Sequence, residues 1–185
     1  MDATLRNQEI NAVFAAPWAY PGLPTRLATS CCLGFEERHH LVWSSWTIFN
    51  GGQQVYARRI EWPRMMGTDS QTGEFSRTFA SESMIDRALA DALIAEAMAA
   101  ASLEPPTDAD ACAIDGAEKS LRFWHEGAPK SLNWQSSPGG SALDAWFARA
   151  AEFLDKRLPE SSAQAYYNIR LDEMPSKAGS DPRQP

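Results

Sequence analysis

Residues 141–158 read SALDAWFARAAEFLDKRL, and they predict one long amphipathic helix. At about 100° per residue, the large apolar side chains fall on one arc of roughly 140°. These side chains are Leu143, Trp146, Phe147, Ala150, Phe153, Leu154 and Leu158. Ser141 and Asp144 have the spacing of a capping box, and Pro159 is expected to end the helix. A face that carries two phenylalanines and one tryptophan must be buried against a neighbouring surface.

A meander of strands directly before this helix is the surface that we expect it to cover. Residues 112–114, 119–125 and 130–135 alternate in the manner of strands and are separated by glycine-containing turns. The helix residues expected to be buried are Trp146, Phe147, Phe153 and Leu154. Their expected partners on the strands are Leu121, Phe123, Leu132 and Trp134. Together they predict a helix lying across a sheet.

A second strand meander is predicted in the N-terminal half. Residues 40–49, HLVWSSWTIF, are rich in β-branched and aromatic side chains, which favours a strand. The Asn-Gly-Gly sequence at 50–52 predicts a hairpin turn before a return strand at 53–62. This return strand has no cleanly apolar face, which is typical of an edge strand or a two-sided strand. Residues 26–33 are weakly strand-like.

An alanine-rich helix is predicted between the two meanders. Ser83 and Asp86 have the spacing of a capping box, and alanine favours the helix that follows. The predicted fold class is therefore α+β. It consists of antiparallel β meanders at about 26–62 and 112–135, packed against helices at about 83–101 and 141–158.

The flanking and connecting segments differ in composition from these elements. Residues 1–22 contain two prolines and three aromatic residues and are predicted to form an N-terminal arm. Residues 23–171 are predicted to form a single α+β domain, and the polar residues 172–185 a disordered tail. Residues 63–78 have no apolar period and predict a long loop, a kind of segment that often carries function.

The overall composition predicts a globular protein of the cytoplasm. The 185 residues are 44% hydrophobic and 10% aromatic, which excludes disorder throughout the chain. Three cysteines, two of them adjacent, do not suggest a disulfide framework and favour a reducing compartment. The first residues lack the apolar core of a secretory signal, and no run approaches the roughly 18 apolar residues of a membrane span.

The charge of the chain is concentrated in one segment. The net charge is −7, and residues 81–118 hold nine acidic residues and only one basic residue. Such a segment either keeps the protein soluble or steers a basic partner toward it, and the sequence leaves both interpretations open. Direct binding of nucleic acid is disfavoured, because it needs a basic surface.

Candidate metal ligands and nucleophiles are present, but their spacing is poor. Cys31, Cys32, His39 and His40 are adjacent in pairs, and neighbours on a strand point to opposite faces, so a zinc site is not predicted. No metal and no cofactor are expected. Cys112 with His125 would make a nucleophile pair, but neither lies in a recognisable catalytic motif.

The sequence therefore favours a non-enzymatic cytoplasmic binding protein. The specific hypothesis is an inhibitor or immunity-type protein that neutralises a basic toxin or enzyme through an acidic surface. The residues expected to contact this protein partner are Met65, Met66, Phe75, Asp108 and Asp110. The alternatives are a small enzyme that uses Cys112 or the His39–His40 region, and a subunit of a larger assembly.

Overall fold

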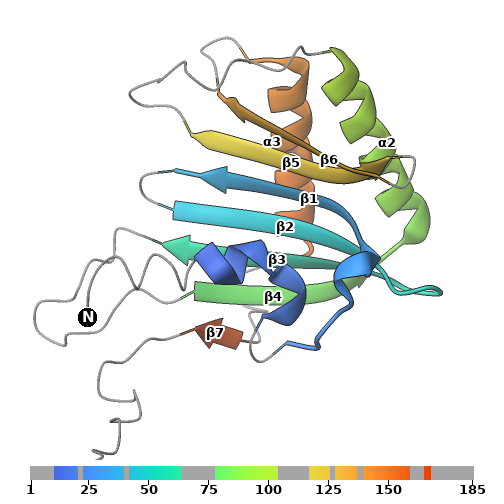
Figure 1. Ribbon diagram of the computed structural model, residues 1–185, viewed down its shortest axis with the longest axis vertical. Coiled ribbons are helices and arrows are strands. Elements are labelled where there is room, and N and C mark those ends of the chain that lie inside the picture. Colours follow the sequence, from blue (N-terminus) through green and yellow to red (C-terminus); the bar gives the residue numbers. More distant parts are fainter. Residues whose placement is uncertain are drawn as a thin grey trace, which may run out of the picture.

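The strands form one antiparallel sheet in the order β6-β5-β1-β2-β3-β4-β7 (Figure 1). The computed structural model describes residues 11–20, 23–39, 42–63, 78–103, 117–125, 128–136, 140–158 and 165–167. The strands are β1 (Cys31–Arg38), β2 (Val42–Asn50), β3 (Val55–Pro63), β4 (Thr78–Ile85), β5 (Glu118–His125), β6 (Ala128–Gln135) and β7 (Ala165–Tyr167). The long helices are α2 (Arg87–Leu103) and α3 (Ala142–Asp155).

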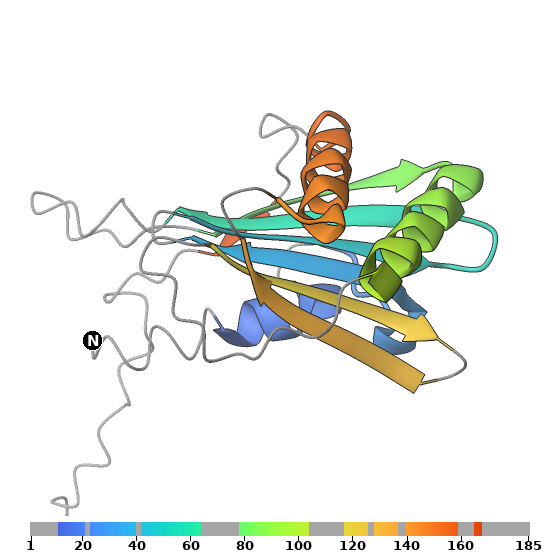
Figure 2. The ribbon, with the colours of Figure 1, turned by 90° about the horizontal axis from the view of Figure 1, so that it is seen from above.

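Two layers cover this sheet on opposite faces. Figure 2 shows α2 and α3 on one face and the N-terminal segment on the other. This segment consists of a helical stretch at 11–15 and the 3-10 turns η1 (Pro17–Ala19) and η2 (Ala28–Ser30). We call the described residues between 11 and 30 the arm. The predicted α+β class, with antiparallel meanders packed against two helices, is confirmed.

The order of the strands follows from two long connections. Strands β1 to β4 pair in sequence, and the chain then crosses the sheet through α2 so that β5 pairs with β1. After the β5–β6 hairpin, α3 leads to β7 at the opposite edge, where β7 pairs with β4. Both helices lie on the same face because both connections cross that face (Figure 2).

The predicted hairpin turn at residues 50–52 is confirmed between β2 and β3. Gly52 has a φ of 84°, a left-handed conformation that glycine adopts without a steric penalty. Its N–H donates to Asn50 Oδ1 at 3.1 Å, and the Gly51 N–H donates to the Gln54 carbonyl at 2.8 Å. Of the two alternatives for the return strand, the two-sided strand is the one observed, because β3 lies between β2 and β4 and has buried residues on both faces.

Helix α3 packs as its apolar arc predicts. Trp146, Phe147 and Leu154 are buried, whereas Phe153 is only partly buried. The predicted strand partners share this core, although Leu132 is also only partly buried. The shortest ring contacts of Phe147 with the sheet, however, come from the first meander. Phe147 lies edge-on to Phe35 at 5.2 Å and to Trp46 at 5.8 Å between ring centroids.

The start of the first long helix differs from the prediction. Ser83 does not cap it, because β4 continues through Ile85 and pairs along its length with β3. Asp86 is the capping residue instead, and its Oδ1 accepts the Leu89 N–H at 3.3 Å. Residues 26–30, expected to begin a strand, belong to the arm. In both places long-range contacts override a weak local preference.

The arm is fixed to β2, β3 and β4 by a second core cluster and by buried polar contacts. Phe14 and Tyr20 are buried with Ile60 and Trp62 of β3. The Tyr20 hydroxyl lies 3.0 Å from the carbonyl oxygen of Thr78 on β4 and donates a hydrogen bond to it. The arm is therefore a packed layer over one half of this face.

A partly buried carboxylate, that of Asp144, connects the N-terminus of α3 to β5 and β6. Asp144 Oδ1 accepts hydrogen bonds from Lys119 Nζ at 2.9 Å and Trp134 Nε1 at 3.1 Å. Its Oδ2 accepts from the Ser141 backbone, and the Ser141 hydroxyl accepts from the Asp144 N–H, which completes the predicted capping box. Burial by itself raises the pKa of Asp144, but the bonds from Lys119 and Trp134 and the Lys119 charge outweigh it and lower the pKa to about 2.

We expect the free energy of unfolding to fall in acid, as the Asp144 carboxylate becomes protonated. Its folded pKa lies below the ordinary value of 3.8, so its contribution is present above about pH 4 and is lost as the pH falls toward 2. The expected loss is about 2 kcal/mol. Urea unfolding at pH 5 and pH 2.5 measures it. The Asp144→Asn variant should be less stable at pH 5 and should lose less on acidification, and equal losses in both proteins would refute this role.

Candidate functional site

The arm leaves part of its face of the sheet open. In Figure 1 the arm crosses β2, β3 and β4, and no described segment crosses this face over β5 and β6. The cross-strand register gives the side chains that share this open face. One row reads Asn133, Ser120, Glu36 and Ser45 from β6 to β2, and the next reads Ser131, Arg122, Gly34 and Thr47. Polar residues thus fill these rows from β6 to β2, whereas the covered half carries Ile60, Ala80 and the Arg58–Glu82 ion pair.

Two adjoining hollows lie on this open face. A cavity of about 50 Å³ lies under the edge of the arm, and a wider polar depression of about 240 Å³ extends over β5 and β6. Both are lined by Glu36, Ser120 and Arg122. We call this continuous surface the sheet groove, lined by Gly34, Glu36, Ser45, Thr47, Ser120 and Arg122. Phe14, Pro17 and Trp18 of the arm form its rim.

A buried carboxylate is the principal charge of the sheet groove. Glu36 is only 5% exposed, although it is a charged residue. Its Oε1 accepts a hydrogen bond from Arg38 Nε, and the Arg38 guanidinium lies over the Trp43 ring at 4.8 Å. Its Oε2 lies 3.7 Å from Arg122 Nη2, too far for a hydrogen bond. One carboxylate oxygen is thus firmly held, and the other is only loosely paired.

A buried hydroxyl and an open space lie beside this carboxylate. Ser45 pairs with Glu36 across the β1–β2 ladder and is 5% exposed. Among the described residues its Oγ has no hydrogen-bond partner. Unsatisfied buried polar groups are uncommon in folded proteins, and each calls for an explanation. Gly34 lies in the adjacent row, and a Cβ added to it would have no neighbour within 4 Å among the described atoms.

The cysteine beside the sheet groove has the properties of an inert thiol. Cys31 lines the cavity under the arm. Burial, and then the neighbouring Cys32, raise the pKa of Cys31 to about 11, and burial also raises the pKa of Cys32. Both thiols are therefore protonated at neutral pH, whereas a catalytic cysteine needs the thiolate.

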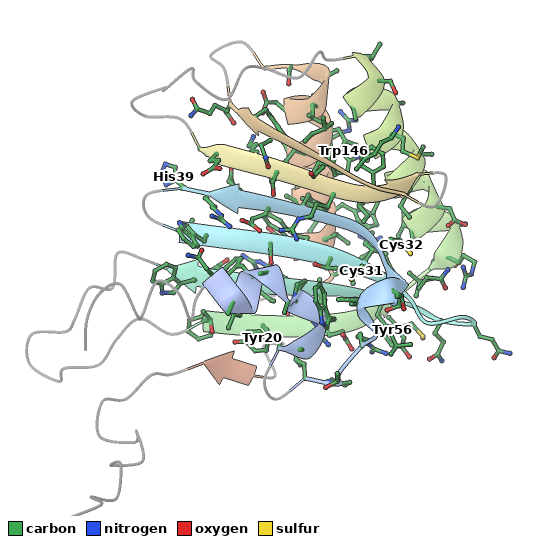
Figure 3. All side chains as sticks on the ribbon, viewed as in Figure 1. Tyr20, Cys31, Cys32, His39, Tyr56 and Trp146 are labelled. Atoms are coloured by element: carbon green, nitrogen blue, oxygen red, sulfur yellow. The ribbon has the colours of Figure 1, made fainter. Side chains whose placement is uncertain are left out.

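The candidate zinc ligands are separated by the length of one strand. Cys31 and Cys32 begin β1, whereas His39 follows its end, as Figure 3 shows. At about 3.3 Å per residue the strand holds them more than 20 Å apart. Within the described part of the chain, no three histidine, cysteine or acidic residues cluster in a way that would hold a metal ion.

The residues predicted to contact a partner lie outside the described part of the chain. This holds for all five of them: Met65, Met66, Phe75, Asp108 and Asp110. Cys112 and His40 also lie outside it, as does the side chain of His125. The expected contact surface therefore stays a prediction.

The described acidic residues from 81–118 do not share one surface. Glu82 is partly buried and pairs with both Arg26 and Arg58, on the face covered by the arm. Glu96 of α2 is exposed and pairs with Arg149 of α3 on the opposite face. Glu118 borders the open polar depression. The sequence count thus overstates how much of this charge a single partner would meet.

The sheet groove was not predicted from the sequence, although a signal for it exists. Gly34 and Glu36 alternate with the buried Leu33 and Phe35 along β1. On β2, Ser45 and Thr47 alternate in the same way with Trp46 and Ile48. Small and polar residues opposite large apolar ones on two strands indicate a sheet with one poorly covered face. The alternation does not reveal that β5 joins the same sheet, because this pairing depends on the long crossover through α2.

Comparisons with known proteins give no match: no family model, no curated protein and no solved structure matches the chain. None of the described helices is long and apolar enough to cross a membrane. The function is therefore inferred from the arrangement of the residues themselves.

Proposed function

We propose that this protein is a non-enzymatic binding protein that holds a basic protein partner, in the manner of an inhibitor or immunity protein. The sheet groove forms part of its contact surface. The observation that carries this proposal is the groove itself: a buried Glu36 carboxylate and, in the cavity at the edge of the arm, a Ser45 hydroxyl that has no hydrogen-bond partner among the described residues. Such groups give specificity when a partner completes their hydrogen bonds.

The chemistry of the sheet groove supports binding rather than catalysis. A serine nucleophile needs a base within hydrogen-bond reach, and Ser45 has no partner among the described residues. Glu36 is held by Arg38, and the Cys31 thiol is protonated at neutral pH. These groups can donate, accept and orient, which is what recognition requires.

The charge of the chain supports a basic partner. The net charge of −7 attracts a basic protein at long range and accelerates its association. Within the sheet groove the charges of Glu36 and Glu118 are matched by those of Arg38 and Arg122. The groove therefore supplies local specificity, and the acidic residues elsewhere supply the long-range attraction.

The test is to identify the partner and then to measure its association across a salt series. Exposed charges are screened within about 8 Å at physiological ionic strength, so the association rate should fall as salt rises. Changing Asp108 and Asp110 to lysine should lower the association rate more than it raises the dissociation rate. Lys156→Glu serves as a control, since Lys156 is exposed at the C-cap of α3 and already pairs with Glu152. An association rate that does not change with salt would refute electrostatic capture.

A further inference from the structure

We infer that the sheet groove is a subsite for one basic side chain, arginine or lysine, of a protein partner, and that Arg122 occupies its place in the free protein. This inference rests on the proposed function and makes it specific. The partner's cation would contact Glu36 Oε2 and the Ser45 hydroxyl, and its aliphatic stem would lie along the aromatic rim of the arm.

The negative charge of this subsite is fixed in place. Glu36 belongs to β1, which is hydrogen-bonded to β2 on one side and to β5 on the other. Its side chain is 7% exposed, and Arg38 holds Oε1. A buried carboxylate is stable only when it is paired, so the loosely paired Oε2 favours any cation that reaches it.

The positive charge that now faces Oε2 is exchangeable. The Arg122 side chain is 47% exposed, and its Nη2 makes only the 3.7 Å contact with Glu36. Arg58, on the same face, is by contrast fully buried and donates to Glu82 Oε2 and to the Pro17 and Pro24 carbonyls. Arg58 is thus locked in the structure, whereas Arg122 can turn into solvent at little cost.

The space beside Glu36 suits a cationic head group. The cavity of about 50 Å³ lies over Gly34, where the absence of a side chain leaves room, and Ser45 borders it. A guanidinium carries five N–H donors and an ammonium carries three, so either can satisfy Glu36 Oε2 and Ser45 Oγ together. A carboxylate in the same place would face the fixed Glu36 charge at close range, which disfavours an acidic side chain.

The aromatic rim completes the match to a long basic side chain. Phe14, Pro17 and Trp18 border the cavity on the side of the arm. Lysine and arginine pack their methylene stems against apolar surfaces while their charged ends reach polar groups. A small inorganic cation would make no use of this rim, so the arrangement favours a side chain presented by a protein.

The experiment titrates the full chain with the capped peptide acetyl-Gly-Arg-Gly-amide, followed by calorimetry and by amide shifts in NMR spectra. The same peptide with citrulline in place of arginine keeps the shape and removes the charge. We expect the arginine peptide to shift the amide signals of Gly34 and Ser45, and the citrulline peptide to bind at least tenfold more weakly. Equal binding of both peptides, or shifts confined to α2 and α3, would overturn the inference.

Three variants separate the subsite from general charge effects. Glu36→Gln should weaken peptide binding about tenfold, because it removes the fixed charge. Gly34→Val should weaken it similarly by filling the space, without changing any charge. Arg122→Gln should strengthen binding roughly two- to fivefold, because it removes the competing guanidinium. If Glu36→Gln is unfolded by circular dichroism, Gly34→Val and Arg122→Gln decide the result alone.

Arg149→Gln is the matched control. Arg149 Nη2 also lies 3.7 Å from a glutamate oxygen, that of Glu96, but on the helix-covered face. Arg149→Gln removes the same charge as Arg122→Gln and should leave peptide binding unchanged. A gain in peptide affinity equal to that of Arg122→Gln would overturn the inference. If a basic protein partner binds Gly34→Val and Glu36→Gln with unchanged affinity, the subsite is refuted, but the proposed function is not. A partner that is not basic would refute the proposed function, while the peptide titration would still decide on the subsite.

Discussion

Replacing Phe147 by alanine is expected to lower the free energy of unfolding by about 3–5 kcal/mol, the usual cost of truncating a buried phenylalanine. Phe147 is 2% exposed and belongs to the core cluster between the sheet and the two long helices. Its ring contacts Phe35, Trp46 and Trp134, which belong to β1, β2 and β6. Its removal therefore takes packing from both meanders at once.

Urea unfolding followed by tryptophan fluorescence measures this change. Phe153→Ala on the same helix is the control, because Phe153 is only partly buried and its ring lies 3.4 Å from the Arg157 guanidinium carbon. It should cost clearly less than Phe147→Ala. If the two variants have the same unfolding midpoint, or if Phe147→Ala unfolds like the wild type, α3 does not organise the core.

The sequence predicts well those features whose determinants are local. The apolar arc of residues 141–158 and the Asn-Gly-Gly turn at 50–52 each contain the information that specifies them, and both are confirmed. The boundary at Ser83 is different. Its capping pattern is local, but the pairing of Ser83 with Ala57 and of Ile85 with Val55 keeps the chain extended to Ile85. Which signal prevails depends on a strand far away in the sequence.

The candidate site depends even more on distant contacts. Arg58 resembles a surface charge in the sequence, because nothing near it indicates that the arm will cover β3. Glu36 and Arg122 are likewise distant in the sequence and meet only because β5 pairs with β1 after the α2 crossover. A charge count along the chain therefore cannot separate a buried ion pair from an exposed binding group. Alternation along single strands indicates the polar face, but not its neighbours.

Replacing Glu82 by glutamine is expected to lower the free energy of unfolding by about 3–5 kcal/mol, because it leaves a buried charge without its counterion. Arg58 is fully buried, and burial lowers the pKa of its guanidinium. The Glu82 charge acts in the opposite direction and raises this pKa. Arg58 Nη2 lies 2.6 Å from Glu82 Oε2, and Arg58 also holds the Pro17 and Pro24 carbonyls of the arm. Losing Glu82 therefore weakens the attachment of the whole arm.

Hydrogen exchange distinguishes this loss of the arm from a general loss of stability. In Glu82→Gln the exchange rate of the amides of residues 23–30 should increase more than that of the amides of β1 and β2, because the arm opens before the sheet unfolds. Glu96→Gln is the control. Its pair with Arg149 is exposed, so this variant should change the free energy of unfolding by less than about 1 kcal/mol.

The double variant Arg58→Met with Glu82→Met should recover part of the lost stability, because it removes both charges of the pair. It should not recover all of it, because the Pro17 and Pro24 carbonyls lose their donor. A double variant less stable than Glu82→Gln alone would contradict the claim that the unpaired charge is the main cost.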